Sequence, residues 1–358
     1  MQVDELLKLM VNKGASDLHL TVPSPPVLRI DGELIPQKDL PPMTAKDIGL
    51  ALEQIATQDQ RSVFDREWEL DCTYTLPGLA RFRVNALRQR GVISLAFRFV
   101  PFYVPSIDEW GLPQILKELI LKPKGLILVT GPSGCGKSTT LAAMLSHLND
   151  NATRSVITIE DPIEFVFRNK ECIIRQRDLG DDTKSFATAV IHALRHDADV
   201  IVIGEMRDLD TISAAITAAE TGHLVLGTLH TIDAPQSIDR IVDVFPYGQQ
   251  QQIRVQLSEV IEAVISQALV PRIDEGRIAA FEIMLASDTI RTKIREGKVF
   301  EIPVTIEVST PERMQSLDQA LADLVKRKVV KLEDALIKSS NRGKLQRFLQ
   351  SRGEVVTS

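Results

Sequence analysis

The sequence predicts an α/β protein of several domains: a small α+β domain, then a parallel α/β domain, then a helical C-terminal region. Residues 66–100 alternate between apolar and polar side chains, with turns at Pro77-Gly78 and Arg90-Gly91, which is typical of an antiparallel meander. Further along, short apolar runs alternate with helical stretches, as a parallel sheet covered on both faces requires. With 358 residues, 44% of them hydrophobic, the chain is long enough for two or three cores.

The first hundred residues carry the signals of the small α+β domain. Apolar side chains recur on one face over residues 3–12, which predicts a helix, and a short strand over 17–21 follows. A hairpin is predicted to turn at Asp31-Gly32, and a second helix is predicted over 45–56. Together with the meander, these elements predict a domain over residues 1–100.

A proline-bounded connector over 101–105 leads to the parallel domain, which we expect over 106–287. Its predicted strands are apolar on both faces and are separated by helical stretches: 126–130, 155–159, 200–203 and 224–228. Beyond residue 287 the chain is charged and helical in pattern, so we expect a helical region over 288–358.

Composition argues against several classes of protein. The net charge of −6 disfavours a dedicated nucleic-acid binder, so no nucleic-acid partner is expected. The cysteines Cys72, Cys135 and Cys172 form no CxxC pair, which indicates neither a disulfide framework nor a structural zinc site. No secretory leader or long apolar span is evident. We therefore expect a cytoplasmic protein that reaches a membrane only through a partner.

The strongest chemical signal is a phosphate-binding loop directly after the predicted strand 126–130. Gly131-x-x-x-x-Gly136-Lys137-Ser138 matches the P-loop, whose glycines let backbone N–H groups approach phosphates. Lys137 would meet the β and γ charges, and Ser138 would ligate Mg²⁺. The predicted nucleotide-binding residues of the loop are Ser133, Gly134, Cys135, Gly136, Lys137, Ser138 and Thr139. The loop by itself does not determine the base of the nucleotide.

Polar side chains follow the next strands of the same predicted sheet. Glu164, in the segment 160–164, could orient and deprotonate the attacking water. Glu205 follows the strand 200–203 and could hold Mg²⁺ directly or through water, with Asp208 as an alternative acid. His230 follows the strand 224–228 and could donate to the γ-phosphate, reporting its hydrolysis.

These four motifs, in this order and spacing, resemble the secretion ATPase superfamily, whose members power type II secretion and type IV pili. Within it the chain is similar to the pilus retraction branch, which holds the PilT- and PilU-type ATPases. The resembling segments run through nearly the whole chain: ASDLHL (15–20), ARFRVN (80–85), GPSGCGKSTT (131–140), ITIEDPIEF (157–165), VIGEMRD (202–208), GHLVLGTLHT (222–231), IDRIVDVFP (238–246) and MQSLDQAL (314–321).

The resemblance implies a PAS-like N-terminal domain, a RecA-like ATPase domain and helical C-terminal elements, assembled as a homohexameric ring that binds ATP and Mg²⁺ between the two domains. Glu164 would be the general base, Glu205 the Walker B acid that holds the metal with Ser138, and His230 part of the His box. Arg81 and Arg83 would reach the triphosphate from the N-terminal sheet.

The same resemblance implies where and with what the chain works. The implied partners are other copies of the chain, the inner-membrane platform protein of the pilus and a second retraction ATPase paralogue. The implied location is the inner face of the membrane at the pilus base, where the motor would drive retraction and twitching motility.

Two features favour the retraction side of the superfamily. No cysteine follows Cys172, so the tetracysteine zinc insert usual in assembly ATPases is missing. Residues 289–296 resemble the AIRNLIRE signature of retraction motors, with Thr289, Thr292 and Lys293 in place of Ala, Asn and Leu. Alternatives stay open: an assembly or type II secretion ATPase without its insert, a RecA-type nucleic-acid translocase, a ring without turnover, and a PilT or a PilU type within the branch.

Overall fold

The computed structural model describes residues 2–30, 32–100 and 104–350, and the chain divides into two compact units. The N-terminal unit comprises residues 1–103 together with 164–166, and the ATPase unit comprises 104–163 together with 167–358. Asp31 of the predicted hairpin and residues 101–103 of the predicted connector lie outside the described residues, as do 351–358 of the predicted helical region.

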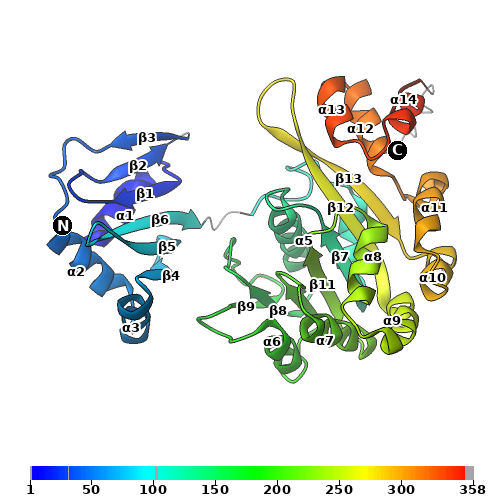
Figure 1. Ribbon diagram of the computed structural model, residues 1–358, viewed down its shortest axis with the longest axis horizontal. Helices are drawn as coiled ribbons and strands as arrows, with labels where there is room; N and C mark the ends of the chain where they lie inside the picture. The colour runs from blue at the N-terminus through cyan, green and yellow to red at the C-terminus, as the bar shows by residue number, and fades with distance from the viewer. Residues whose placement is uncertain (1, 31, 101–103, 351–358) are drawn as a thin grey trace. The chain divides into compact units, whose positions relative to one another are not determined.

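The N-terminal unit is a six-stranded antiparallel sheet in the order β3-β2-β1-β6-β5-β4, with three helices (Figure 1). The strands are β1 (Asp17–Leu20), β2 (Val27–Ile30), β3 (Glu33–Pro36), β4 (Glu69–Leu76), β5 (Ala80–Gln89) and β6 (Val92–Val100). The helices are α1 (Val3–Asn12), α2 (Ala45–Ile55) and α3 (Gln58–Glu67). This confirms the predicted meander and both predicted helices.

One face of this sheet buries its side chains against the helices. Phe82 on β5 and Phe97 on β6 pack in one core with Leu7 of α1. Helix α3 was not predicted, because only Phe64 of its residues is buried and no apolar repeat marks its face. The alternation that predicted the meander thus reflects a sheet with only one of its faces in this core.

The ATPase unit is built on a seven-stranded sheet in the order β13-β12-β7-β11-β10-β8-β9. Neighbouring strands are parallel except the β12–β13 pair. The strands are β7 (Gly125–Thr130), β8 (Ser155–Glu160), β9 (Ile173–Asp178), β10 (Val200–Ile203), β11 (Leu224–Leu229), β12 (Ile261–Pro271) and β13 (Arg277–Leu285). The four predicted strands are confirmed, whereas β9 and the β12–β13 hairpin were not identified from the sequence.

Both faces of this sheet are covered, which explains the uninterrupted apolar runs. Leu126 and Leu128 of β7 face one core, and Ile127 and Val129 face the other. The first face packs on α6 (Phe186–Ala193), α7 (Leu209–Glu220), α8 (Ala234–Asp243), α9 (Tyr247–Val260), α10 (Asp288–Arg295) and α11 (Ile302–Val308). The second packs on α4 (Ile115–Ile120) and α5 (Lys137–Asn151). The result is a three-layered α/β unit (Figure 1).

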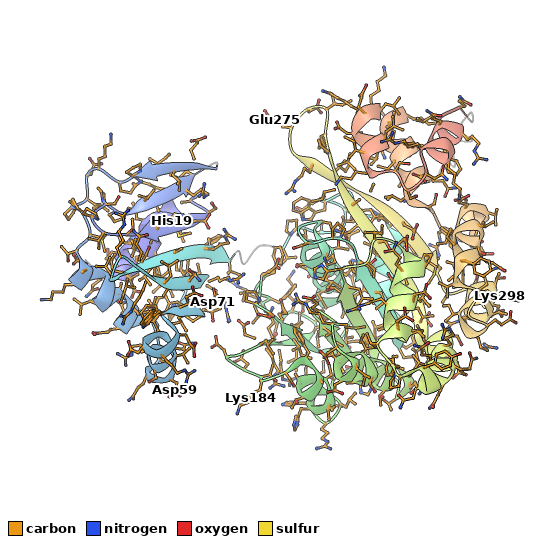
Figure 2. All side chains as sticks on the ribbon, viewed as in Figure 1. His19, Asp59, Asp71, Lys184, Glu275 and Lys298 are labelled. Carbon is orange, nitrogen blue, oxygen red and sulfur yellow. The ribbon has the colours of Figure 1, made fainter. Side chains whose placement is uncertain are left out.

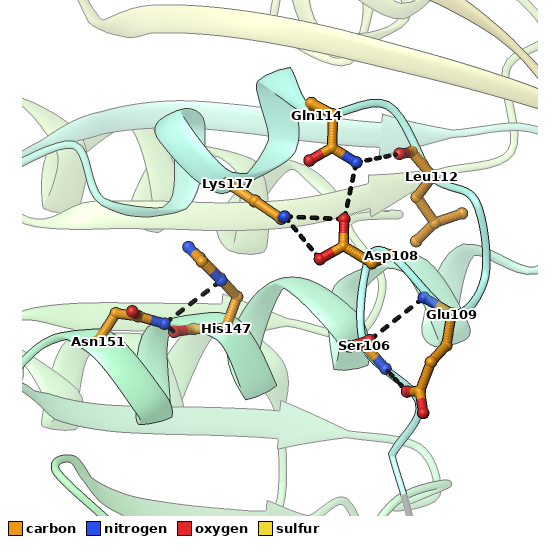
Figure 3. Close-up of polar contacts among 8 residues, drawn as sticks. All are labelled: Ser106, Asp108, Glu109, Leu112, Gln114, Lys117, His147 and Asn151. Atoms are coloured by element: carbon orange, nitrogen blue, oxygen red, sulfur yellow. Dashed lines mark hydrogen bonds and ion pairs between the residues drawn. The ribbon is translucent and has the colours of Figure 1, made fainter.

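Polar contacts shape the segment that enters the ATPase unit and join it to α4 (Figure 3). Ser106 N–H donates to Glu109 Oε2 (2.6 Å), and Glu109 N–H donates to Ser106 Oγ (3.2 Å). Lys117 Nζ of α4 donates to both oxygens of Asp108, at 2.7 and 2.8 Å. The first pair of bonds closes a local turn, and the Lys117–Asp108 pair joins this turn to α4.

Helices follow the hairpin to the end of the described chain: α10, the short 3₁₀ helices η1 (Val299–Glu301) and η2 (Thr310–Glu312), α11, α12 (Leu317–Lys326), α13 (Leu332–Lys338) and α14 (Arg342–Gln350). Contacts alone do not separate them from the preceding core, since one unit runs to residue 358. The division at 287/288 therefore stays a prediction.

Asp318 joins α12 to the last helices. It is 2% exposed, and its Oδ1 accepts from Ser339 Oγ (2.6 Å). Its Oδ2 accepts from Ser340 Oγ (2.8 Å) and Asn341 N–H (3.1 Å). The carboxylate therefore fixes the turn between α13 and α14.

Replacing Asp318 by Ala should destabilise the protein by about 2–4 kcal/mol, because it removes a buried charged acceptor and its three hydrogen bonds across the α13–α14 turn. Urea unfolding followed by circular dichroism measures this free energy. Asp323→Ala on the same helix, which removes only an exposed ion pair with Arg327, should change it by less than about 1 kcal/mol. Equal effects of the two changes would contradict the anchoring role of Asp318.

Candidate active site

The parallel strands bring the predicted functional segments to one edge of the sheet. Thr130 at the end of β7 lies opposite Leu229 at the end of β11. Ile203, the last residue of β10, lies between Ile159 of β8 and Gly227 of β11. The segments that begin at Gly131, Gly204 and His230 therefore leave the sheet together. In open α/β sheets this is the edge where ligands bind.

The P-loop backbone has a shape that only glycine permits at its first position. Gly131, Gly134 and Gly136 have φ angles of +139°, +74° and +94°. A Cβ on Gly131 would lie 2.5 Å from the carbonyl oxygen of Gln267 and 2.6 Å from Cys135 Sγ. Cys135 is buried, and burial raises the pKa of its thiol. The loop is thus packed directly against β12.

Helix α5 begins in the P-loop with its N-terminal amides unshielded by a side chain. Gly136 is the N-cap and makes no side-chain cap, so the first turn of the helix presents N–H groups and a positive dipole end to an anion. Lys137 Nζ donates to the carbonyls of Gly131 (2.8 Å) and Pro132 (3.1 Å). Of the other predicted loop residues, Ser133 and Gly134 are exposed, and Ser138 and Thr139 are half-buried.

Gln267 holds this loop in place, and the sequence analysis did not identify it. The side chain is 3% exposed; its Nε2 donates to Cys135 O (2.6 Å), and its Oε1 accepts from Thr140 Oγ1 (2.8 Å). One carboxamide therefore ties the loop to the first turn of α5. The available signal was a glutamine inside the apolar run of residues 263–270, because a buried amide requires partners.

Glu205 and His230 are brought into contact. His230 Nε2 lies 2.9 Å from Glu205 Oε1, and Arg207 Nε donates to the same oxygen. Burial raises the pKa of the Glu205 carboxyl, but the Arg207 hydrogen bond and the charges of His230, Arg207 and Lys137 outweigh it, so the pKa is lowered overall. Glu205 is therefore ionised at neutral pH, within the field of the P-loop lysine.

Asp208, the alternative acid, has a structural task. Its Oδ1 accepts from Thr211 N–H (2.9 Å) and its Oδ2 from Thr211 Oγ1 (2.8 Å), so it caps the N-terminus of α7. The segment before it is fixed by Thr228, whose Oγ1 donates to Gly204 O and whose carbonyl accepts from Met206 N–H (3.0 Å). Asp208 is thus occupied as a helix cap, whereas Glu205 contacts Arg207 and His230 at the end of the neighbouring strands.

The remaining predicted residues lie in the acidic segment after β8 and in the N-terminal unit. Glu160 Oε1 accepts from Thr158 Oγ1 (2.6 Å) and Gln176 Nε2 (3.0 Å), which fixes the start of the acidic segment. Glu164 groups with the N-terminal unit, as do Arg81 and Arg83. Their roles stay predictions.

On β5, Arg81 and Arg83 occupy the face opposite the buried side chains of Phe82 and Val84. Arg81 Nη2 donates to Thr73 Oγ1 (3.0 Å), and Arg83 is exposed. This is the placement that the alternating pattern of residues 66–100 predicts for them.

The segment that resembles the retraction signature is α10 with its next residue. Arg291 Nη1 donates to the last carbonyls of α9, Ser258 O (2.8 Å) and Glu259 O (2.9 Å). Its Nη2 donates to Glu262 Oε1 (2.9 Å). Arg291, the first arginine of the signature, thus caps the C-terminus of α9. Lys293, which replaces the signature leucine, forms an ion pair with Glu301.

A phosphate-binding loop between a buried strand and a helix N-terminus, with an ionised acid at a nearby parallel strand end, defines the class of P-loop nucleotide hydrolases. Comparison with known proteins gives the particular family. Residues 107–301 match the family model of the type II/IV secretion system protein. The chain is 46% identical to the type IV pilus retraction ATPase PilT of Pseudomonas aeruginosa, over 94% of this chain and 97% of that protein.

Two further comparisons agree. The type IV pilus ATPase PilU of Pseudomonas aeruginosa is 38% identical, over 99% of this chain and 93% of that protein. A crystal structure of the pilus retraction motor PilT with bound ADP superposes with a TM-score of 0.90 at 43% identity, covering 97% of this chain and 99% of that one. The chain belongs to the type II/IV secretion ATPase family, in its PilT/PilU branch. It is an ATPase with a RecA-like domain, as the resemblance implied.

Replacing Gln267 by Ala should weaken ADP binding about tenfold, because two hydrogen bonds that shape the P-loop are lost at a cost of ~1 kcal/mol or more. Isothermal titration calorimetry measures the Kd. Gln252→Ala, at an exposed position of α9, is the control and should leave the Kd unchanged. An unchanged Kd for Gln267→Ala would show that the loop keeps its shape without this brace.

Glu205→Gln should lower kcat by about 100-fold or more with little change in stability, because the ionised carboxylate beside the P-loop is lost. Asp208→Ala should instead lower stability by about 1 kcal/mol through loss of the α7 cap and leave kcat nearly unchanged. Phosphate release and thermal melting of both variants separate the two roles. The opposite pattern would make Asp208 the acid of the site.

Proposed function

We propose that the chain is a homohexameric motor that retracts type IV pili by hydrolysing Mg-ATP and turning against the inner-membrane platform protein of the pilus. The observation that carries the proposal is the contact of His230 with Glu205 beside the P-loop of Lys137. The similarity to the PilT retraction ATPase over 94% of the chain supports pilus retraction as the work of this motor.

Nucleotide binding uses groups that the loop already presents. The amides at the start of α5 receive phosphate oxygens, and Lys137 exchanges its bonds to Gly131 O and Pro132 O for the β- and γ-phosphates. Ser138 and the ionised Glu205 are hard oxygen donors of the kind Mg²⁺ takes. When bound, Mg²⁺ would neutralise charge that develops on the phosphates.

Hydrolysis requires a base and a response to phosphate loss. Glu164 orients and deprotonates the attacking water. His230 donates to the γ-phosphate while it is present and contacts Glu205 when it is gone, so the hydrogen bonding at the end of β11 differs between the two states. Arg81 and Arg83 add cations from the N-terminal unit, which gives ATP a differential affinity for arrangements of the two units and lets turnover move them.

The proposed partners follow from this motor. Copies of the chain form the ring, the platform protein takes up the movement, and a PilU-type paralogue could act beside it. Within residues 2–30, 32–100 and 104–350, no helix combines the length and apolarity needed to cross a bilayer. Contact with the platform protein would place the ring at the membrane.

Phosphate release from size-separated fractions, with and without single-stranded DNA, tests the motor directly. We expect turnover in the ring-sized fraction, indifferent to DNA, and restored twitching when the gene is returned to a strain that lacks its retraction ATPase. Turnover that depends on DNA would identify a nucleic-acid translocase instead, and restored secretion without twitching would identify a secretion ATPase.

Glu164→Gln should reduce kcat by about 100-fold or more and leave ADP affinity within about twofold, because the base acts only in the chemical step. Lys137→Ala should abolish turnover and binding together. Glu171→Gln, at an exposed position on the same connection, serves as the control. A normal rate in Glu164→Gln would overturn the assignment of the base.

A further inference from the structure

Strand β13 carries a buried acid that the reaction as proposed does not use. Glu282 is 8% exposed, and its Oε1 accepts from the backbone N–H of Ala234 (2.8 Å), the first residue of α8. The helix follows directly on the segment 230–233 that begins with His230. A side chain of the hairpin therefore holds the end of the His230 segment.

Glu282 ends a polar row that begins beside the P-loop. Thr130, the residue before Gly131, donates through Oγ1 to Ser266 Oγ of β12 (2.8 Å). Ser266 lies directly opposite Glu282 in the β12–β13 pair, so the two side chains share a face of the sheet. Thr130 and Ser266 are 0% and 1% exposed. Thr130, Ser266 and Glu282 thus lie in a row on one buried face of the sheet. The row runs from the P-loop strand β7 to β13, where Glu282 contacts the start of α8.

The His230 segment has further attachments at its α8 end. Thr231 Oγ1 and Ser237 Oγ are 2.7 Å apart, and the Asp233 side chain accepts from Gln236 N–H (2.8 Å). These contacts are local to the segment and the helix. The bond from Ala234 N–H to Glu282, by contrast, joins the start of α8 to strand β13 of the sheet.

The β12–β13 hairpin consequently braces both sides of the site. Gln267, next to Ser266, holds the P-loop through Cys135 O and Thr140 Oγ1. Glu282, opposite Ser266, holds α8. A displacement of the hairpin would therefore act on the phosphate-binding loop and the His230 segment together.

Three acids act on Glu282, and one of them, Glu307, is paired with Lys344 of α14. Asp233 lies at the start of α8, Glu307 on α11 and Asp318 on α12, and each carries negative charge toward it. Burial, with the charges of these acids, raises the pKa of Glu282 to about 7, against the effect of the Ala234 hydrogen bond. The carboxylate form is the stronger acceptor at a helix N-terminus, so the attachment strengthens as pH rises through neutrality.

We propose that Glu282 is a positioning residue for the ATPase reaction: by holding the first turn of α8 it sets His230 against Glu205 and links that segment to the P-loop through the β12–β13 hairpin. The inference rests on the role proposed above for His230. It does not require Glu282 to touch nucleotide.

Three variants of the full chain test it. Glu282→Ala removes the acceptor, and Glu282→Gln keeps an oxygen for Ala234 N–H but cannot ionise. Glu275→Gln is the matched control, since Glu275 is an exposed acid in the loop at the far end of the same hairpin (Figure 2). Thermal melting verifies that each variant is folded before its rate is measured.

Glu282→Ala should lower kcat about tenfold, while the KM for ATP and the Kd for ADP change by less than about twofold, because the P-loop contacts remain. Glu282→Gln should recover most of kcat but lose the part of the rise in kcat between about pH 6 and 8 that follows ionisation of Glu282. Glu275→Gln should match the parent chain in both. A parental kcat for Glu282→Ala, or a parental pH profile for Glu282→Gln, would overturn the inference.

Hydrogen exchange separates this inference from the proposed function. The amides of residues 229–236 should exchange faster in Glu282→Ala than in Glu275→Gln. If His230→Ala retains the parental kcat and Glu282→Ala shows the faster exchange, the role proposed for His230 fails and the attachment by Glu282 stands. If His230→Ala is inactive while Glu282→Ala has parental exchange and kcat, the positioning role fails alone.

Discussion

The packing of the P-loop against strand β12 is the constraint on which the ATPase site depends. The backbone at Gly131 approaches the Gln267 carbonyl so closely that no side chain fits between them, and the Gln267 carboxamide joins Cys135 to Thr140. This contact sets the direction in which α5 begins, and with it the direction of the amides that would receive phosphate. The loop is specified by its neighbour in the sheet as much as by its own glycines.

Parallel pairing supplies the second half of the site. Because β10, β11 and β7 end at one edge, Glu205 and His230 meet within hydrogen-bonding distance although they are far apart in the sequence. The carboxylate stays ionised there because the Arg207 hydrogen bond and nearby cations outweigh its burial. The charges of His230 and Lys137 thus both act on the carboxylate of Glu205.

The proposed chemistry draws on residues from both units of the chain, which is how it could produce movement. The P-loop, Glu205 and His230 belong to the ATPase unit, whereas Glu164, Arg81 and Arg83 group with the N-terminal unit. A reaction that needs both sets of residues proceeds only in arrangements that bring them together. In the proposed motor, binding and loss of phosphate would shift the balance between such arrangements, which is how a nucleotide can drive movement.

The sequence by itself determined the meander, the four central parallel strands, the P-loop and the family, because these depend on local periodicity and on short motifs. Tertiary structure decided what such patterns do not encode. Asp208 and Glu205 follow the same strand, and only their partners distinguish the acid that caps α7 from the acid that contacts His230. Gln267 and Glu282 carry no motif, because their importance comes from residues that folding places beside them, more than a hundred positions and nearly fifty positions away in the chain.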